Sequence, residues 1–474
     1  MQPPADPNWP SNHGEKSAGT IVLIGASIRS AAQSAQRAGF QVLGIDHFGD
    51  VDTRQACHEF WILTEFLANP DAMRRFRQSP IFMVGGLNSV EGLSEFLATA
   101  NAMQTDFPIS DAVEPGSPPV ANTPAQRWDD PEWLRKLSEE CSLSFPVTIS
   151  SLSADAQPPN LPGKRWLEKT LNSCGGLGVR WHQSSPPSSP PSSPPSRRAR
   201  AESNRVLADT GIQVTQPEFP SEPAPTDHTI LQEWIPGRPH GATLISNGKD
   251  CRLLGVCRSL FTRIGDRPFV YRGSCGPVAI PHHLGHRLQN LGRKLVRATA
   301  HRGLLNIDLV INRQSEAFIL EVNPRWSGSS EVIERWLQAR NFTDSLFGEM
   351  FQACNGSALA GFNSPSNEAS VFSASPSATC PLYLKQIVFA RDKIRFSRGQ
   401  LGISAGTSDH RLNHPTLADF PRDGTPISSG DPICTLVSEL PRQTLHASPG
   451  SCKEKGPVHP HRALLHRLFG SAAS

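Results

Sequence analysis

The sequence predicts mixed α/β and α+β domains, because a region of alternating strands and helices is followed by a region of paired strands. The chain has 474 residues, too many for one compact core, and suggests roughly three domains at about 150 residues each. It contains 43 Pro, and hydrophobic and charged residues make up only 37% and 19%. Segments rich in Pro and Ser dilute a globular composition in this way, so part of the chain is expected to be unstructured.

The first predicted domain is a Rossmann-like parallel sheet at 19–118, after a disordered segment at 1–18. Strand, helix, strand and strand are expected at 20–25, 30–38, 41–45 and 81–84, an order that implies right-handed crossovers. Asp46 closes the second strand, as in dinucleotide-binding folds. Only Gly25 stands where the fingerprint G-x-G-x-x-G needs three glycines, so we do not expect an NAD site.

A second domain is expected at 119–355, with antiparallel strands at its centre. It begins with a helix, because either aspartate before Pro131 can cap a helix that has proline in its first turn. Asn247-Gly248 is a typical hairpin turn. Strands are expected at 229–235, 242–246, 251–259, 305–311 and 317–322, and helices at 284–301 and 331–346.

Segments of low complexity interrupt and follow this domain. The motif SSPP is repeated within 183–203, and proline prevents regular strand pairing, so a disordered surface insertion is expected there. Residues 356–379 are Ser-rich and loop-like. A small β-rich C-terminal module is expected at 380–440, and 441–474 is expected to be mostly disordered. The module's strands are expected at 382–389 and 433–437.

Charge and cysteine usage narrow the class of protein. Forty-six Lys and Arg against 43 Asp and Glu give a net charge of +3, without a basic stripe, so no nucleic-acid partner is expected. The ten cysteines are scattered without a Cys-x-x-Cys pair, which indicates reduced thiols and a cytoplasmic location. No apolar run is long enough to span a membrane and the first residues are polar, so no membrane partner or secretion is expected.

The most informative segment is the predicted hairpin around residues 314 and 315. Asp308 and Glu321 are equally far from that turn, so they are expected to lie opposite each other on one face. Asn323 lies two residues beyond Glu321 and therefore shares the face. Two carboxylates and an amide oxygen converge in an otherwise apolar hairpin, an arrangement that a cation would stabilise.

Hard oxygen ligands of this kind suit Mg²⁺ better than Zn²⁺, with Mn²⁺ as an alternative. The competing interpretation is a hairpin whose acids only face water. Apolar residues on both faces of the strands, such as Ile307, Leu309 and Ile319, indicate a buried hairpin instead. A metal site at Asp308 and Glu321 is therefore predicted.

A glycine-rich turn is expected between two strands within 164–182. Gly175, Gly176 and Gly178 follow Lys169, and glycines let backbone N–H groups approach phosphate oxygens while a lysine supplies positive charge. The lysine precedes the glycines, so this is not a Walker A loop. An ordinary turn between strands is the alternative.

The strand that ends at Pro236 is a candidate for binding adenine. Its last residues are Gln232, Glu233, Trp234 and Ile235. An extended segment can offer a backbone N–H and C=O to the base, while an acid accepts hydrogen bonds from the ribose or amine. An ordinary strand with one exposed acid is the alternative.

The order and spacing of these three features resemble the ATP-grasp superfamily, in which ATP is held between two α+β subdomains. The resemblance covers about residues 120–350, and the first domain resembles the pre-ATP-grasp domain that usually precedes them. It implies that Lys169 contacts ATP phosphates, that the glycines form a mobile flap, and that Glu233 and Ile235 lie along the adenine hinge. The Mg²⁺ ligands would be Asp308, Glu321 and Asn323, and the arginines acting on the phosphoryl group or acceptor would be Arg325, Arg258 and Arg272.

The sequence departs from the family pattern in the phosphate-binding region. A second, earlier lysine is usual, but the matching neighbourhood has Arg127, with Arg135 and Lys136 on the following helix. Thr170 follows Lys169 where proline is usual. An arginine can still neutralise phosphate, so whether Arg127 replaces the lysine is left open.

The resemblance implies an ADP-forming carboxylate-amine ligase that uses ATP and Mg²⁺ to activate a small-molecule carboxylate as an acylphosphate for attack by an amine. Small-molecule or cofactor biosynthesis is the expected setting. The alternatives are a phosphotransferase, a biotin-carboxylase-like enzyme suggested by 424–437, and a non-catalytic ATP-binding regulatory protein. The oligomeric state is left open, with a homodimer as one alternative.

Overall fold

The computed structural model describes residues 18–87, 90, 92–98, 128–149, 164–170, 173–182, 229–359, 381–397 and 416–440. The predictions for Arg127, for 183–203 and 441–474, and for nearly all of 1–18 and 356–379 lie outside the described residues. All positions discussed below lie within these ranges.

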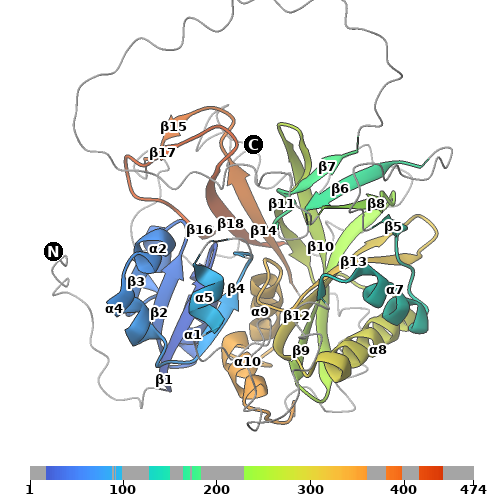
Figure 1. Ribbon diagram of the computed structural model, residues 1–474, viewed down its shortest axis with the longest axis horizontal. Helices are drawn as coiled ribbons and strands as arrows, with labels where there is room; N and C mark the ends of the chain where they lie inside the picture. The colour runs from blue at the N-terminus through green and yellow to red at the C-terminus, as the bar shows by residue number, and fades with distance from the viewer. Residues whose placement is uncertain are drawn as a thin grey trace, which may run out of the picture.

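The N-terminal domain is a parallel sheet, as predicted. Its strands β1 (Gly19–Gly25), β2 (Phe40–Asp46), β3 (Glu59–Ile62) and β4 (Ile81–Val84) have the order β3-β2-β1-β4. Short helices accompany them, α1 (Arg29–Arg37), α2 (Val51–Gln55), α3 (Leu63–Leu67), α4 (Pro70–Phe76) and α5 (Leu93–Ala98) (Figure 1). Strand β3 was not predicted, because its sequence EFWI includes a charged residue, whereas the equally short β4 is wholly apolar and ends at glycines.

An eight-stranded sheet forms the centre of the molecule, in the order β13-β12-β9-β10-β11-β14-β18-β16. Neighbouring strands pair antiparallel. Its strands are β9 (Arg238–Asn247), β10 (Cys251–Ile264), β11 (Arg267–Gly276), β12 (Arg302–Ile311), β13 (Ala317–Asn323), β14 (Leu382–Phe389), β16 (Thr416–Ala418) and β18 (Pro432–Leu440). The predicted C-terminal strands are present, and they continue the sheet of the preceding domain, while β15 (Ile394–Arg395) pairs with β17 (Pro426–Ile427).

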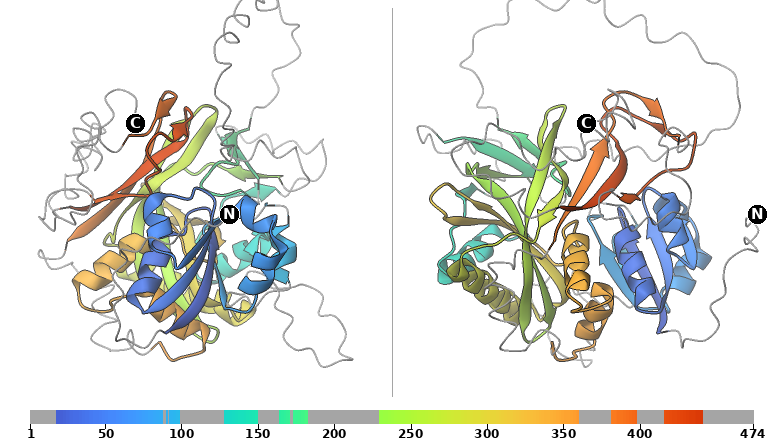
Figure 2. Two further views of the ribbon diagram at one scale, coloured as in Figure 1. Left: turned by 90° about the vertical axis from the view of Figure 1, so that its left-hand side faces the viewer. Right: turned by 180° about the vertical axis from the view of Figure 1, so that it is seen from behind.

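Helices cover both faces of this sheet. Helix α8 (His282–Thr299) packs on one face through apolar residues such as Leu288 and Leu295. Helices α9 (Ser330–Ala339) and α10 (Leu346–Cys354) lie on the other face, between the large sheet and the N-terminal sheet (Figure 2).

The predicted helix at 331–346 is wrong in its second half. Helix α9 ends at Ala339, and Asn341 has a φ of 55°, a left-handed conformation that ends a helix and that Asn tolerates. Ser345 then begins a new helix by accepting a hydrogen bond from the Gly348 N–H at 3.0 Å.

A second, smaller sheet forms the other lobe of the region predicted to bind ATP. Its order is β5-β8-β6-β7, from β5 (Thr148–Ile149), β6 (Trp166–Thr170), β7 (Val179–Trp181) and β8 (Thr229–Glu233). Helix α7 (Pro131–Glu140) precedes it, and the predicted cap is confirmed because Asp130 accepts from the Glu132 and Trp133 N–H groups. The expected two subdomains are therefore present.

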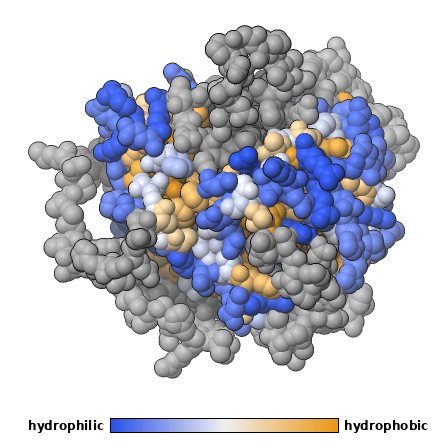
Figure 3. Space-filling view, turned by 90° about the horizontal axis from the view of Figure 1, so that it is seen from below, coloured by the Kyte–Doolittle hydropathy of each residue, from blue (hydrophilic) through white to orange (hydrophobic). Residues whose placement is uncertain are grey.

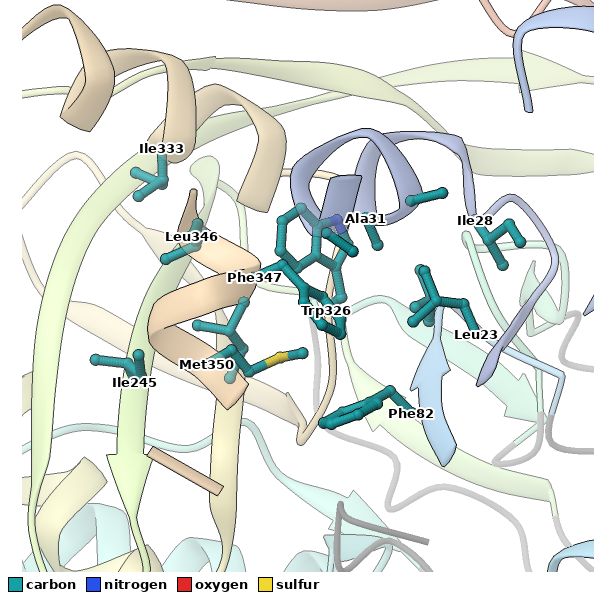
Figure 4. Packing of buried hydrophobic residues seen from close by; sticks show 14 of the residues in the cluster. Leu23, Ile28, Ala31, Phe82, Ile245, Trp326, Ile333, Leu346, Phe347 and Met350 are labelled. Atoms are coloured by element: carbon teal, nitrogen blue, oxygen red, sulfur yellow. The ribbon is translucent and has the colours of Figure 1, made fainter. Parts of the chain in front are cut away.

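Trp326 joins the N-terminal domain to the large sheet. Its side chain is 1% exposed and packs among Leu23, Phe82 and Met350 (Figure 4). The indole N–H donates to Ser30 Oγ at 3.0 Å, and the backbone oxygen accepts from the Gly85 N–H at 3.2 Å. The loop that follows β13 is thus held by the N-terminal domain.

Figure 3 shows one face of the molecule, and most of its described surface is hydrophilic. On the face seen from below, hydrophobic residues form small areas among hydrophilic ones (Figure 3). The large hydrophobic side chains that are exposed, within the described ranges, are Phe48, Val147 and Phe261. No helix in these ranges is both long and apolar enough to cross a membrane. All cysteines in the described part of the chain are free thiols, as predicted.

Candidate active site

Asp308 and Glu321 lie directly opposite each other on β12 and β13, as predicted. Near the turn the register is one residue different, with Leu309 opposite Ile319, so Leu320 is an extra residue in a β-bulge. Successive residues of a strand alternate between faces, and a bulge shifts that alternation by one. Without the extra residue, Ile319 and Glu321 would share a face; the bulge lets the first enter the core while the second joins Asp308.

The three predicted metal ligands converge. The Asn323 Nδ2 group donates to Asp308 Oδ2 at 2.9 Å and to Glu321 Oε1 at 3.2 Å. The other Asp308 oxygen, Oδ1, accepts from Asn306 Nδ2 at 2.8 Å. An amide that donates to two carboxylates brings partial positive charge to the point where the negative charges meet.

The electrostatics of the pair are unequal. Burial and the Glu321 carboxylate raise the pKa of Asp308 well above its ordinary value. Desolvation raises the pKa of Glu321, but the Lys169 ammonium and the Asn323 amide outweigh it, so that pKa lies below its ordinary value. Glu321 keeps 50% of its side chain exposed. Asp308 is therefore the more buried of the two carboxylates, and Glu321 is open to solvent.

This donor set fits Mg²⁺. Two carboxylates and an amide supply only oxygen atoms, and a divalent cation would offset the repulsion that raises the pKa of Asp308. Within the described ranges, no group of three or more His, Cys, Asp and Glu side chains could hold a metal. The predicted set has only two acids, and Asn323 would supply a third oxygen only after its amide turns over, because Asn323 Oδ1 accepts from Arg325 Nη1 at 2.7 Å in this structure.

Lys169 connects the small sheet to these carboxylates. It lies on β6, and its Nζ is 3.4 Å from Glu321 Oε2 and 3.2 Å from Gln232 Oε1 on β8. Gln232 is buried and donates its Nε2 to Thr148 Oγ1 at 3.1 Å. The lysine is thus placed between the adenine-binding candidate and the metal candidate.

The predicted glycine-rich turn connects β6 and β7, and it lies on β11. Gly175 has a φ of 62° and accepts the Tyr271 N–H at 2.8 Å. Gly176 has a φ of 75°, and a Cβ there would be 1.8 Å from the Phe269 carbonyl oxygen. A Cβ at Gly178 would be 2.2 Å from Ser173 Oγ. The two lobes touch here, because glycine permits a closer backbone approach than any other residue.

The segment predicted as the adenine hinge leaves β8 toward β9. The Glu233 carboxylate accepts from Lys164 Nζ at 2.9 Å, and its backbone N–H donates to Val147. The Trp234 ring lies 5.6 Å from that of Trp181, and Ile235 is half-buried. The Glu233 carboxylate is thus paired with Lys164 in this structure, whereas the prediction assigned it to the ribose or the adenine amine.

The three arginines occupy different places. Arg325 Nη1 donates to Asn323 Oδ1 at 2.7 Å, so it lies at the metal candidate. Arg258 is opposite His240, which is opposite Leu309, whereas Asp308 is opposite Gly241. Opposite residues share a face, so Arg258 is on the other side of the sheet from Asp308 and is not brought to the carboxylates.

Arg272 lies on β11, near the C-terminal segment. Burial and the charge of Arg391 lower its pKa. Arg135 and Lys136, considered as substitutes for the missing lysine, pair with Glu132 on their own exposed helix. In this structure, Arg135 and Lys136 therefore form ion pairs within their own helix.

Two residues of the site were not predicted. Asn306 contacts Asp308, and Gly86 lies where the glycine turn meets Arg325. A Cβ at Gly86 would be 2.2 Å from the Cys174 Cβ and 3.3 Å from Arg325 Nη2. Asn306 could have been found, since it is two residues before Asp308 on a predicted strand. No local signal marks Gly86, which is distant in sequence.

Comparison with known proteins agrees with this architecture. Residues 208–329 match the family model described as ATP-grasp domain. The carboxyaminoimidazole ribonucleotide synthase from Aspergillus clavatus is similar, with 12% identity and a TM-score of 0.55 over 95% of this chain and 98% of that chain.

Two other solved structures are similar. The L-amino acid ligase from Bacillus licheniformis has 14% identity and a TM-score of 0.54, over 90% of this chain and 94% of that chain. Biotin carboxylase from Campylobacter jejuni has 12% identity and a TM-score of 0.55, over 89% and 87%. No curated protein matches the sequence. The chain contains an ATP-grasp domain and has the fold of the ATP-grasp superfamily.

Proposed function

We propose that the protein is an ADP-forming ligase that uses ATP and Mg²⁺ to join a small-molecule carboxylate to an amine. The observation that carries this proposal is the meeting of two lobes at Glu321, where Lys169 of the small sheet reaches the face that also holds Asp308 and Asn323. Similar structures include a protein named as an amino acid ligase.

In the proposed reaction, a carboxylate oxygen of the substrate attacks the γ-phosphorus of ATP, the bond to the β-phosphate oxygen breaks, and ADP leaves. The amine then attacks the acyl carbon, phosphate leaves, and the amine proton passes to solvent. When bound, Mg²⁺ would neutralise charge on the phosphate oxygens.

The protein's own residues position the reactants and balance charge. Asp308, Glu321 and Asn323 would hold the metal, and Lys169 would bind phosphate oxygens opposite them. The glycine turn contacts β11, and from there it would cover the bound phosphates and exclude water. Arg325, fixed by Asn323, would contact the transferred phosphoryl group or the acceptor carboxylate. Arg272 stays a predicted acceptor contact.

The test is ADP release from ATP–Mg²⁺ in the presence of pooled amino acids and polyamines, with the new amide identified by mass spectrometry. Glu321→Gln should lower turnover by roughly 10²-fold or more, because a metal-binding charge is lost. Its melting temperature should change little, because the lost pairing with Lys169 is offset by the relieved repulsion of Asp308.

Glu316→Gln is the matched control, since Glu316 is exposed in the turn of the same hairpin. It should leave turnover unchanged. Near-normal ADP release by Glu321→Gln would contradict the metal assignment. Tight nucleotide binding without ADP release would instead favour a regulatory protein.

A carboxylase is the second candidate, in which bicarbonate is the carboxylate. Similar structures include proteins named as biotin carboxylase and as carboxyaminoimidazole ribonucleotide synthase. ADP release that needs bicarbonate and an amine, and that is not supported by amino acids alone, would favour a carboxylase.

Localisation in the cytoplasm is proposed from the free thiols.

A further inference from the structure

Asn306 contacts Asp308 of the candidate metal site from within the protein. The proposed reaction gives this residue no role. Its side chain is on β12, two residues before Asp308, and the residue is 4% exposed. Its Nδ2 donates to Asp308 Oδ1 at 2.8 Å. A buried amide must have partners for both its donor and its acceptor.

The acceptor side of this amide is fixed by two hydroxyl groups. Asn306 Oδ1 accepts from Ser329 Oγ at 3.2 Å and from Thr243 Oγ1 at 3.4 Å. These two hydroxyls are 3.1 Å apart, and Ser327 Oγ is 2.9 Å from Ser329 Oγ. We name Asn306, Thr243 and Ser329 the Asn306 network. Because a carboxylate oxygen accepts while the hydroxyl groups can donate, the amide presents Nδ2 to Asp308 and Oδ1 to Ser329 and Thr243.

Three separate elements contribute to this network. Thr243 is on β9, Asn306 is on β12, and Ser329 ends the loop that begins after β13. Opposite the site, Gly241 leaves space, since a Cβ there would be 3.1 Å from Asn306 Oδ1 and 3.3 Å from Asp308 Oδ1. Asn306 therefore holds Oδ1 of the carboxylate while Asn323 holds Oδ2, and rotation of Asp308 is restricted.

We propose that Asn306 is a positioning residue of the metal site, which orients Asp308 through the network that Thr243 and Ser329 fix. The inference rests on the proposed function, since it assumes that Asp308 binds a divalent cation. Asn306 itself is placed behind the carboxylate and acts only through it. Partners of this kind commonly change metal affinity by about 10–100-fold.

The experiment measures Mn²⁺ binding to the full chain in the presence of ADP, by the loss of the free Mn²⁺ signal in electron paramagnetic resonance beyond the loss that the same ADP causes without protein. Asn306→Ala should weaken Mn²⁺ binding by about 10-fold or more. Thr243→Val keeps the shape of the side chain and removes the hydroxyl, so it should weaken Mn²⁺ binding about 3-fold to 10-fold while the protein stays folded.

Ser246→Ala is the matched control. Ser246 is also a buried hydroxyl on β9, but it donates to the His301 carbonyl oxygen at 2.8 Å, away from Asp308. This variant should bind Mn²⁺ like the unmodified protein. A purely structural role for Asn306 predicts instead that Mn²⁺ binding follows melting temperature across all three variants.

Asp308→Asn separates failure of the inference from failure of the proposed function. If this variant loses Mn²⁺ binding while Asn306→Ala and Thr243→Val bind normally, the positioning role is overturned and the metal site stands. If the unmodified protein binds no Mn²⁺ with ADP, the proposed function is overturned and the inference with it.

Discussion

Single residues in this protein show how burial decides the behaviour of a charge. Asp308 and Glu321 face each other, yet the neighbouring Lys169 and the exposure of Glu321 make the second a better anion than the first. Unequal pairs of acids of this kind are enriched at functional sites, where burial and neighbouring charges shift pKa values in opposite directions.

His301 is another buried titratable residue. Its shifted pKa leads us to expect a measurable pH dependence of stability. The residue is 0% exposed, and its Nε2 lies 3.1 Å from the Leu304 carbonyl oxygen. Burial lowers its pKa from 6.5 to about 4. The unfolded chain therefore binds a proton more tightly, so stability that is present above pH 6.5 is lost as pH falls toward 4.

His301→Gln should remove this loss. Between neutral pH and pH 4, the free energy of unfolding of the unmodified protein should fall by roughly 3 kcal/mol more than that of the variant. Urea titrations at several pH values measure the difference. Parallel pH profiles for the two proteins would contradict the prediction.

At the scale of elements, the site depends on close backbone contacts. The bulge at Leu320 turns Glu321 toward Asp308, and the glycine turn between β6 and β7 rests on β11. Arg180 Nε also reaches Asp266 Oδ2 at 2.8 Å, which ties β7 to the turn between β10 and β11. The small lobe thus contacts the large one through the main chain at the glycine turn and through this ion pair.

Gly176→Ala should displace the glycine turn from its contact with β11. A Cβ would be 1.8 Å from the backbone oxygen of Phe269, which cannot move without disturbing β11. The variant should raise the KM for ATP by about 10-fold or more, because the turn would no longer cover the residues that we propose to bind phosphate. Protease cleavage within this turn should become faster, and steady-state kinetics with limited proteolysis measure both effects.

Gly175→Ala is the control for backbone strain. Its φ of 62° is similarly unfavourable for alanine, but nothing lies within 4 Å of a Cβ there. It should cost about 1 kcal/mol of stability without a large change in KM. Equal effects of the two substitutions would show that conformational strain, not the contact with Phe269, controls the turn.

At the scale of the whole molecule, a buried ionic network joins three parts of the chain. Arg29 of α1 donates two hydrogen bonds to Glu331 of α9, at 2.7 and 2.8 Å, and two to Asp419 after β16, at 2.9 and 3.2 Å. Lys385 of β14 lies 3.0 Å from Glu331. Desolvation raises the pKa of Glu331, but the positive charges of Arg29 and Lys385 lower it by more, so the pKa lies well below its ordinary value.

Glu331→Gln should therefore destabilise the protein strongly. It leaves two buried cations with less negative charge, and breaking a buried pair in this way costs about 3–5 kcal/mol. The double variant Arg29→Met with Glu331→Gln should cost less than the sum of the single variants, because the unpaired cation is removed. Chemical unfolding measures the three variants.

Glu139→Gln is the control, since Glu139 pairs with Arg135 on the exposed surface of α7. This substitution should lower the free energy of unfolding by no more than about 1 kcal/mol. If Glu331→Gln costs no more than this control, the network does not hold the N-terminal domain in place.

Much of the fold and the centre of the site could be predicted because the signals are local. Parallel strands follow from the alternation of apolar strands and helices, and Asp308, Glu321 and Asn323 lie within sixteen residues of one another, on one hairpin. The period of two then brings their side chains together. The helix at 331–346 was predicted as one piece because a left-handed Asn341 leaves no distinct pattern in the sequence.

The sequence by itself determined the strands, the hairpin and the oxygen donors, since each depends on neighbours along the chain. Only the tertiary structure decided that Lys169 reaches Glu321, that Arg258 lies on the far face, and that Trp326 is held by the N-terminal domain. The physical reason is that contacts between distant segments depend on how whole sheets pack and on irregularities such as bulges. Those depend on the burial of many side chains together and leave no local periodicity.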